Sequence, residues 1–351
     1  MNNMSLILVL NAGSTSLKYK LFDYQTLKVV KKESFENLPT SGDAHLSAVV
    51  SVLKQIGNLT DIKIVGHRIV HGGTEFQKPT LLDDKNLKNL AKYSSLAPLH
   101  NPYNLKVAQL ARVYLNDIPH VGCFDTSFFI DLPLQAKLYA VPLEYYRKYN
   151  IQRFGFHGIS HQYVANQAAK ILKKNLNKIN LITCHLGGGC SMAAIKKGKA
   201  VDTSMGFTPL EGLVMMTRSG DIDPGLINYF NKECGLSMDQ INDLLNYGSG
   251  IKGLFGTSNF RELLKAAKRG DKKAKLAFEI FIYRIQKYIS SYFGILGNAD
   301  AIVFTGAIGA GDVYTRKNIC QGLKLIKSAK ILAIETDEEL AIAQECQKIL
   351  K

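Results

Sequence analysis

The chain has 351 residues, of which 46% are hydrophobic and 21% are charged, and it carries a formal net charge of +15. This length favours two domains over one, and the composition is that of a folded globular protein rather than a disordered one. The longest apolar runs, Leu6 to Leu10 and Ala301 to Phe304, are far shorter than the ~20 residues that span a membrane, so no membrane partner is expected. Lysines are scattered and form no basic run beside aromatic residues, which argues against nucleic acid as a partner.

The cysteines and the amino terminus indicate a cytoplasmic protein. Six cysteines are dispersed along the chain, and none has the Cys-x-x-Cys spacing of a zinc or redox site, so reduced thiols are expected. The amino terminus has no basic segment, and its apolar run leads directly into Asn11, which argues against a secretory signal.

The first predicted element in the chain is a β-hairpin. Residues 6–10 form a short apolar run closed by a turn at 11–14, and 17–22 alternates apolar and polar residues. A second unit of this kind is predicted at 180–184 and 190–195, joined by a glycine turn at 185–189. A third glycine turn, 305–309, follows the strand 301–304 and should open a helix.

Helix-period apolar residues fill the intervals between these units. They predict helices at 44–56, 105–114, 161–175, 238–246 and 277–293. Strands that alternate with helices indicate α/β domains. Because two strand–glycine–strand units lie about half the chain apart, we expect two related domains that face each other across a cleft, joined near 131–133.

The three glycine turns predict a nucleotide site. A residue without a Cβ lets backbone amides approach a polyphosphate closely, and serine and threonine hydroxyls add donors. None of the turns has the P-loop spacing or a Gly-x-Gly-x-x-Gly run that opens a helix, which excludes the two commonest nucleotide motifs.

Seven segments resemble, in order and spacing, the successive signatures of acetate kinases. They are Leu10–Lys18, Gly66–Gly73, Ala97–Pro102, Phe124–Thr126, Phe154–His161, Asp202–Gly212 and Thr217–Gly220. The resemblance runs from about Leu6 to the end of the chain. It implies an α/β fold of two ribonuclease H-like domains around a central cleft, as in the superfamily of acetate and sugar kinases, heat-shock ATPases and actin.

The same resemblance assigns the parts of the chain. Residues 1–130 would bind the acyl group, with a C-terminal helix at 340–351 that packs back on them. Residues 131–339 would bind the nucleotide and form a homodimer. The implied reaction is the reversible, Mg²⁺-dependent, in-line transfer of the γ-phosphoryl group of ATP to acetate, giving ADP and acetyl phosphate for acetyl-CoA biosynthesis. A propionate or butyrate kinase is the near alternative, and a non-catalytic actin-like nucleotide switch is the alternative of another class.

Catalysis of phosphoryl transfer requires cations and donors around a metaphosphate-like group. By resemblance, Arg218 and His157 stabilise that group, and Arg68 binds the acyl carboxylate or phosphate. Asp125, after the apolar run 120–124, would orient the acyl group or hold the metal through water, and its alternative is a helix N-cap. Mg²⁺, with Mn²⁺ as a substitute, is assigned to Asn11 and Glu338, which offer the oxygen ligands such ions prefer. The segment 336–339 also reads as an ordinary capping box.

Two histidine pairs have a spacing that could bind zinc on a helix, but glycines adjoin them and the glutamate of the usual zinc motif is missing. We expect His67 and His71 of the first pair to be structural. His157 of the second pair and His100 are expected to donate to phosphoryl oxygens, and His185 stays open between the two roles.

The resemblance also supplies the binding residues. The small acyl pocket corresponds to Val70, Leu99, Phe156 and Pro209, where valine favours acetate and leaves propionate as a slower substrate. The nucleotide set is Ser14, Ser16, Lys18, His185, Leu186, Gly187, Gly188, Gly189, Asn259, Phe260, Arg261, Ala307, Ile308, Gly309, Ala310 and Gly311.

The departures from the family pattern fall on the nucleotide side. Gly188 replaces an asparagine, Asn259 an aspartate, and Ala310 with Gly311 a Glu-Asn pair. We therefore expect phosphoryl chemistry with ATP as the default, while GTP stays open. The chain is also shorter than typical members, between Asp23 and Gly66 and between Gly311 and Glu338.

Overall fold

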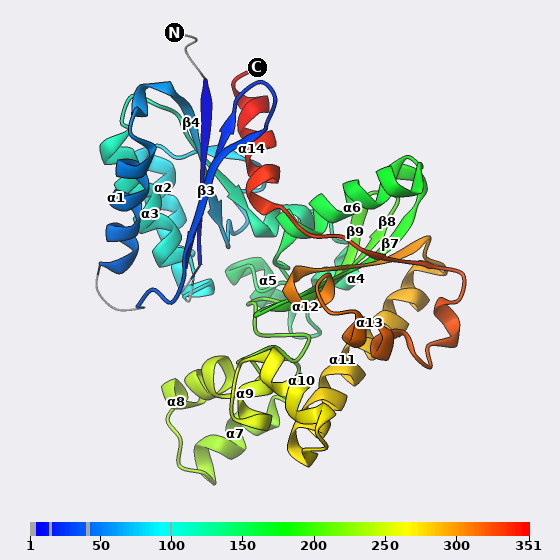
Figure 1. Cartoon of the computed structure of the whole chain (residues 1–351). Coiled ribbons are helices and arrows are strands. Elements are labelled where there is room, and N and C mark those ends of the chain that lie inside the picture. The colour runs from blue at the N-terminus through cyan, green and yellow to red at the C-terminus, as the bar shows by residue number, and fades with distance from the viewer. Residues whose placement is uncertain (1–4, 14–15, 40–42, 99) are drawn as a thin grey trace. The chain divides into compact units, whose positions relative to one another are not determined.

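The computed structural model describes residues 5–13, 16–39, 43–98 and 100–351. These form two compact units (Figure 1). Unit 1 comprises Met1–Ile130, Phe156–Tyr163 and Asp337–Lys351, and unit 2 comprises Asp131–Gly155 and Val164–Thr336. Two segments that the sequence analysis assigned to the second domain, 156–163 and 337–339, thus pack with unit 1.

Unit 1 is built on a six-stranded sheet in the order β3-β2-β1-β4-β6-β5. Its strands are β1 (Leu6–Ala12), β2 (Leu17–Asp23), β3 (Val29–Phe35), β4 (Ile62–Ile69), β5 (Thr80–Leu81) and β6 (His120–Phe124). The first three strands form an antiparallel meander, which confirms the predicted hairpin, and β1, β4 and β6 run parallel. The carboxyl ends of β1, β4 and β6 therefore meet at one edge of the sheet.

Helices cover both faces of this sheet, as Figure 1 shows. The helices are α1 (Ala44–Ile56), α2 (Asp84–Ala91), α3 (Asn101–Tyr114) and α14 (Glu338–Ile349). Alternate residues of β1 serve the two faces: Leu8 packs with α1 and α3, whereas Ile7 and Val9 pack with α14. The helix α14 approaches β4 so closely that a Cβ at Gly66 would lie 2.8 Å from the Cys346 sulfur.

Unit 2 repeats the arrangement with five strands in the order β11-β10-β7-β8-β9. They are β7 (Asn180–Leu186), β8 (Cys190–Lys196), β9 (Lys199–Thr203), β10 (Ala301–Thr305) and β11 (Lys330–Ala333). Again three sequential strands form an antiparallel meander, and further strands run parallel to its first member. The two sheets share this topology, which confirms the predicted duplicated architecture.

The remaining helices include those predicted at 161–175, 238–246 and 277–293, with different ends, and several that were not predicted. They are α4 (Leu134–Lys137), α5 (Leu143–Tyr149), α6 (Gly158–Leu172), α7 (Gly225–Lys232), α8 (Met238–Asp243), α9 (Gly250–Phe255), α10 (Phe260–Lys268), α11 (Lys272–Leu296), α12 (Gly306–Gly309) and α13 (Val313–Cys320). The helix α11 is longer than its apolar period suggested, because Asp271 caps its first turn and Gly297, at φ 75°, ends it. None of the helices in the described ranges is long and apolar enough to cross a membrane.

Candidate active site

The parallel strands of unit 1 place a buried ion pair at the carboxyl edge of their sheet. Arg68 lies near the end of β4, and Asp125 directly follows β6. The Arg68 guanidinium donates from Nε to Asp125 Oδ1 at 3.1 Å and from Nη2 to Oδ2 at 2.7 Å. The Asp125 side chain is only 1% exposed. This two-point geometry fixes both side chains. The alternative interpretation of Asp125 as an N-cap is wrong, because Asp125 is the first residue of a 3₁₀ helix whose N-cap position is Phe124.

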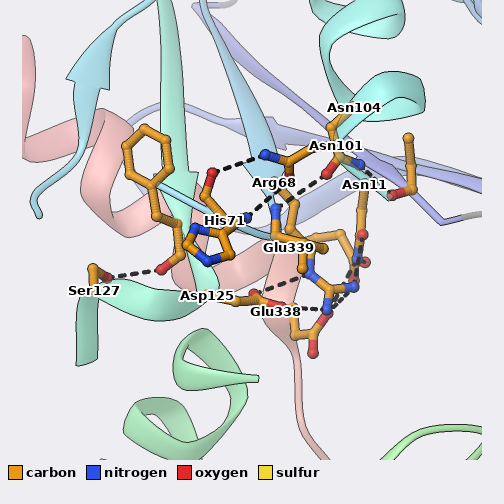
Figure 2. A network of polar contacts seen from close by, with 12 residues as sticks. Asn11, Arg68, His71, Asn101, Asn104, Asp125, Ser127, Glu338 and Glu339 are labelled. Atoms are coloured by element: carbon orange, nitrogen blue, oxygen red, sulfur yellow. Dashed lines mark hydrogen bonds and ion pairs between the residues drawn. The ribbon is translucent and has the colours of Figure 1, made fainter. Parts of the chain in front are cut away.

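Two further segments bring polar groups to the same pair, as Figure 2 shows. Asn11, near the end of β1, donates from Nδ2 to Glu338 at 3.2 Å and to Glu339 at 2.6 Å. Arg68 Nη1 lies 3.3 Å from both Asn11 Oδ1 and Glu338 Oε2. The structure thus brings together residues 327 positions apart in the chain that the sequence analysis assigned to one metal site.

A lysine and an aspartate complete what we call the Arg68 cluster: Asn11, Lys20, Arg68, Asp125, Asp337, Glu338 and Glu339. Lys20 Nζ lies 2.7 Å from Asp337 and 3.3 Å from Glu339. Asp337, rather than a threonine, caps α14 by accepting from Leu340 N at 2.8 Å. With four carboxylates against two cations, the cluster has two negative charges in excess. Sequence reasoning missed Lys20 and Glu339, since nothing in β2 indicates that its lysine reaches the start of α14.

Burial and charge act against each other within the cluster. Loss of hydration would lower the pKa of Arg68, but the carboxylates of Asp125 and Glu338 raise that pKa above its ordinary value. Burial raises the pKa of Asp125, and the Arg68 charge opposes the rise. The arginine therefore remains a cation and is held by carboxylates on two sides.

His157 lies beside this cluster. Its backbone has φ 56°, an uncommon left-handed conformation for a residue with a side chain, and its N–H bonds the Asp125 carboxylate. At the next position a Cβ would collide with the Asp125 carbonyl, so only glycine fits at 158. The segment 156–163 is thereby fixed to unit 1 with His157 beside Asp125.

Two predicted acyl-pocket residues, Val70 and Phe156, are buried in unit 1. Asn104 accepts from Val70 N at 3.1 Å and donates to the Ala12 carbonyl at 2.7 Å, so one side chain connects the residue after β4 to the end of β1. Asn101 accepts from the His71 N–H and donates to the His71 carbonyl, both at 2.9 Å.

The other residues that we predicted near the acyl group and the first turn lie in different surroundings. Leu99 and Ser14 lie outside the described residues. His100 is half-buried and precedes α3. Ser16 closes the first turn by accepting from Gly13 N at 2.8 Å, and Lys18 is exposed near Glu36. Ser16 and Lys18 therefore make their contacts outside the Arg68 cluster.

The histidines predicted to be structural lie in the core of unit 1. His67 stacks on His120, with 2.9 Å between His67 Nε2 and His120 Nδ1. Burial lowers the pKa of His67 well below its usual value, of His120 to about 4 and of His71 to about 3. Within the described ranges, no group of three or more His, Cys, Asp or Glu side chains is arranged to hold a metal ion.

In unit 2 the second and third glycine turns lie side by side. The parallel strands β7 and β10 are paired up to His185 and Thr305, and each is followed by its turn. A Cβ at Gly187 would lie 4.0 Å from Ala307 N. Gly188 has no neighbour within 4 Å of a Cβ position, and Arg316 donates to the Gly309 and Ala310 carbonyls at 2.8 and 2.6 Å. His185 and Leu186 end β7, and Ile308 and Gly311 belong to the other turn.

Arg218 lies on the long loop between β9 and α7, next to the second glycine turn. The Met216 N–H donates to the Gly188 carbonyl at 3.2 Å, and Arg218 Nη1 donates to the Pro209 carbonyl at 2.9 Å. Loss of hydration lowers the pKa of Arg218, and no Asp or Glu of the described chain opposes that effect. This arginine is a partly buried cation without a carboxylate partner.

Two of the three remaining predicted nucleotide residues are engaged within unit 2. Asn259 caps α10, accepting from Arg261 N at 3.0 Å and donating to Glu262 at 3.0 Å. The Phe260 ring is 8% exposed and packs on Phe281, with ring centroids 5.2 Å apart. The Arg261 side chain is exposed. The structure therefore gives Asn259 a capping role that its sequence context did not distinguish from nucleotide binding.

The chain is similar to known proteins over nearly its whole length. Residues 6–348 match the Acetokinase family. The acetate kinase of Carboxydothermus hydrogenoformans is 41% identical over 393 residues, covering 98% of this chain and 99% of that relative. Among solved structures, the acetate kinase of Porphyromonas gingivalis is 35% identical with a TM-score of 0.89, covering 99% and 100% of the two chains. A propionate kinase from Francisella tularensis subsp. tularensis SCHU S4 is 38% identical with a TM-score of 0.91, covering 98% and 100%.

The duplicated sheets, the paired glycine turns and the clustered cations thus define a kinase of the two-domain fold shared with sugar kinases and actin. The chain belongs to the acetokinase family. It is a phosphotransferase that uses a carboxyl group as acceptor, with the activity of an acetate kinase. The alignment with the first relative spans 393 positions, against 351 residues here, so that relative has residues that this chain lacks.

Proposed function

We propose that this enzyme transfers the γ-phosphoryl group of ATP directly and reversibly to acetate, in line, without a covalent enzyme intermediate. The observation that carries the proposal is Arg218, a partly buried cation that donates to a carbonyl and has no carboxylate partner in the described chain. A charge withdrawn from water favours an anion as partner, and the transferring phosphoryl group is one. Arg218 would stabilise the charge that spreads over its oxygens.

We assign the other roles in the reaction to residues of unit 1. Arg68 has four of its guanidinium contacts with Asp125, Asn11 and Glu338, which leaves at most one N–H for the acyl carboxylate or phosphate. Asp125 fixes that guanidinium and, through the His157 N–H, also fixes the turn that carries His157. We assign to the His157 side chain the role of a donor to phosphoryl oxygens.

A divalent cation fits the Arg68 cluster. The two negative charges in excess match the charge of Mg²⁺ or Mn²⁺, and amide and carboxylate oxygens suit either ion. Asn11 and Glu338 would hold it, with water in the remaining positions. When bound, the ion would neutralise charge on the phosphate oxygens.

The glycine turns of unit 2 are assigned to the phosphates, and the base would be recognised loosely. Open space at Gly188 suits a close phosphate, whereas Asn259 and Phe260 are engaged within unit 2. ATP is the default nucleotide, and we expect GTP to support transfer as well.

Acetate is the proposed acid because a valine at position 70 would narrow the acyl pocket, and Val70 is buried in unit 1. Propionate is the second candidate, motivated by the similar propionate kinase structure. A hydroxamate assay with acetate, propionate and butyrate, each with ATP and GTP, decides between them. We expect acetate to have the highest kcat/KM, and Val70→Ala to raise the propionate rate about tenfold relative to acetate. An enzyme that transfers nothing to any acid would instead support a non-catalytic nucleotide switch.

We further propose a cytoplasmic homodimer that produces acetyl phosphate for acetyl-CoA biosynthesis. All six cysteines are free thiols, as expected in a reducing compartment. Exposed Leu226, Tyr229 and Tyr283 in unit 2 offer apolar surface for a second copy. Light scattering during gel filtration tests this: a monomeric mass at micromolar concentration would refute the dimer.

A further inference from the structure

The loop that carries Arg218 has no helix or strand but is well packed. We define the Arg218 loop as residues 204–224, between the end of β9 and the start of α7. Met205, Leu213 and Met215 are 0% exposed. A segment without regular hydrogen bonds needs other partners for its buried backbone groups. These partners show how the loop holds its shape.

Where the loop begins, three consecutive carbonyls share one side-chain partner from outside the loop, Arg153. Arg153 Nη1 donates to the carbonyls of Thr203 and Met205, both at 3.2 Å, and contacts the carbonyl between them at 3.5 Å. Arg153 Nη2 lies 2.5 Å from Glu211 Oε1. The planar guanidinium therefore connects two positions of the loop that are six or more residues apart.

Tyr139 extends this contact to a third position. Its hydroxyl donates to Glu211 Oε2 and accepts from the Phe207 N–H at 2.7 Å. The Arg153 guanidinium lies over the Tyr139 ring, 5.5 Å from its centroid. At Gly206 a Cβ would collide with both Glu211 and Tyr139, so the loop passes this pair only with a glycine. We call Tyr139, Arg153 and Glu211 the loop clamp.

The loop clamp fixes the chain on both sides of Pro209, the residue that accepts a hydrogen bond from Arg218. Phe207 and Glu211 are fixed two residues before and two residues after Pro209, whose carbonyl accepts from Arg218 Nη1 at 2.9 Å. Beyond Arg218, Asp221 accepts from Gly212 N at 2.7 Å and from Tyr288 of α11 at 2.7 Å. Pro209 and Arg218 are thus held between anchors on both sides.

We infer that Arg153, through the loop clamp, is a positioning residue for Arg218 and Pro209 and thereby sets both turnover and acyl selectivity. The inference rests on the proposed roles of these two residues. A lysine cannot replace Arg153, because a single ammonium group cannot reach the carbonyls and Glu211 with the geometry of a planar fork. A displacement of about 1 Å in a catalytic group costs on the order of 100-fold in rate.

The test compares Arg153→Lys, Arg153→Met and the milder Tyr139→Phe with Lys174→Met as control. Lys174 forms an ion pair with Asp300 at 2.7 Å in unit 2 and touches no part of the loop. For each variant, kcat, the KM values for ATP and acetate, the acetate-to-propionate ratio of kcat/KM and the thermal midpoint are measured on folded protein.

We expect both Arg153 variants to lower kcat about 10- to 100-fold, with a changed acetate-to-propionate ratio and a KM for ATP within about twofold of wild type. Tyr139→Phe should lower kcat about three- to tenfold, and Lys174→Met should match wild type. Because Tyr139→Phe removes one hydroxyl, it tests the inference even where the Arg153 variants fold poorly.

Three results would overturn the inference. One is an Arg153→Lys variant with wild-type kcat and selectivity, and another is Tyr139→Phe with both unchanged. The third is a lower thermal midpoint with unaltered kinetics of the folded fraction, which marks a merely structural role. If wild-type enzyme transfers no phosphoryl group to any acid, the proposed function fails first. An active wild type with indifferent variants refutes the inference alone.

Discussion

The surroundings of Arg68 and Arg218 differ in whether carboxylates compensate the charge of the arginine. In unit 1, Arg68 is surrounded by carboxylates in excess, and its pKa lies above the ordinary value. In unit 2, Arg218 has a carbonyl for a partner, and loss of hydration lowers its pKa. The same type of side chain thus stands in opposite surroundings. The Arg68 cluster has negative charge in excess, whereas Arg218 has no carboxylate partner in the described chain.

The largest expected effect comes from removing the uncompensated charge. Arg218→Ala should lower kcat with acetate by about 10³-fold or more, the magnitude seen when a phosphoryl-stabilising arginine is lost. Stability should change little or rise, because a partly buried cation without an ion-pair partner is removed. A coupled assay and urea denaturation measure the two effects.

Arg147→Ala provides the control, since this arginine of unit 2 is exposed on α5 and should leave kcat unchanged. An Arg218→Ala enzyme with at least a tenth of wild-type turnover would contradict the role given to the uncompensated cation.

The second expected effect combines rate and stability. Asp125→Asn leaves Arg68 buried with a weaker partner, and breaking a buried pair costs about 3 kcal/mol. We also expect kcat to fall about 100-fold, because the guanidinium and the His157 turn both lose their fixed partner. The two units would then differ clearly: removing charge destabilises one and spares the other.

Asp84→Asn is the matched control in unit 1. It weakens the ion pair between Arg112 and a carboxylate that is 94% exposed, which contributes less than about 1 kcal/mol. If Asp125→Asn unfolds at the same urea concentration as Asp84→Asn, Asp125 does not compensate Arg68 as described.

How far the sequence predicted this molecule depended on the sequence separation of the contacts. The hairpin of β1 and β2 and the bounds of α1 follow from local alternation and period, and both are confirmed. The pairing of Lys20 with Asp337 joins residues over 300 positions apart, and that of Arg153 with Glu211 spans 58. Residue types do not reveal which side chains meet once the strands are stacked. Only the family resemblance brought Asn11 and Glu338 together in advance.

The local sequence was ambiguous at Asn259 and uninformative at 156–163. Asn259 stands before an apolar-periodic helix, a position where asparagine suits a cap as well as a ligand contact, and the structure shows the cap. The grouping of 156–163 with unit 1 depends on a left-handed His157 and a glycine against Asp125, neither of which a periodicity reveals.

We expect acid to lower the stability of unit 1 more than that of unit 2. His67, His71 and His120 all belong to unit 1 and have lowered pKa values in the folded state. Below about pH 6.5 the unfolded chain binds protons that the folded chain refuses, so stability falls as pH falls, by up to about 1.4 kcal/mol per histidine per pH unit. The contribution is fully present above about pH 6.5 and is lost down to the folded pKa values of about 4 for His120 and about 3 for His71. Only the upper part of this window, above about pH 5, lies clear of the usual carboxylate range.

Amide hydrogen exchange at pH 7.5 and 5.5, corrected for the intrinsic rate, measures this within one sample. Protection should decrease in β4 and β6 of unit 1 and persist in β7 and β10 of unit 2, which serve as the internal control. Equal losses in both units would show that these histidines do not carry the acid sensitivity.

The smallest expected effect concerns the excess negative charge of the Arg68 cluster. Lys20→Met removes one of its two cations, while Glu339 stays oriented through its 2.6 Å bond to Asn11 and Asp337 still caps α14. At roughly 10 Å in a water-like dielectric, losing one positive charge favours a divalent cation by about 0.8 kcal/mol, which corresponds to about a fourfold lower half-saturating Mg²⁺ concentration.

Lys348→Met is the matched control, because this exposed lysine of α14 pairs with Glu345 away from the cluster. Titration of Mn²⁺ binding by its electron spin resonance signal measures the ion directly, apart from turnover. Weaker binding in Lys20→Met would mean that Lys20 orders the carboxylates more than it offsets their charge, and the contrast with Arg218 would then be one of geometry rather than of charge.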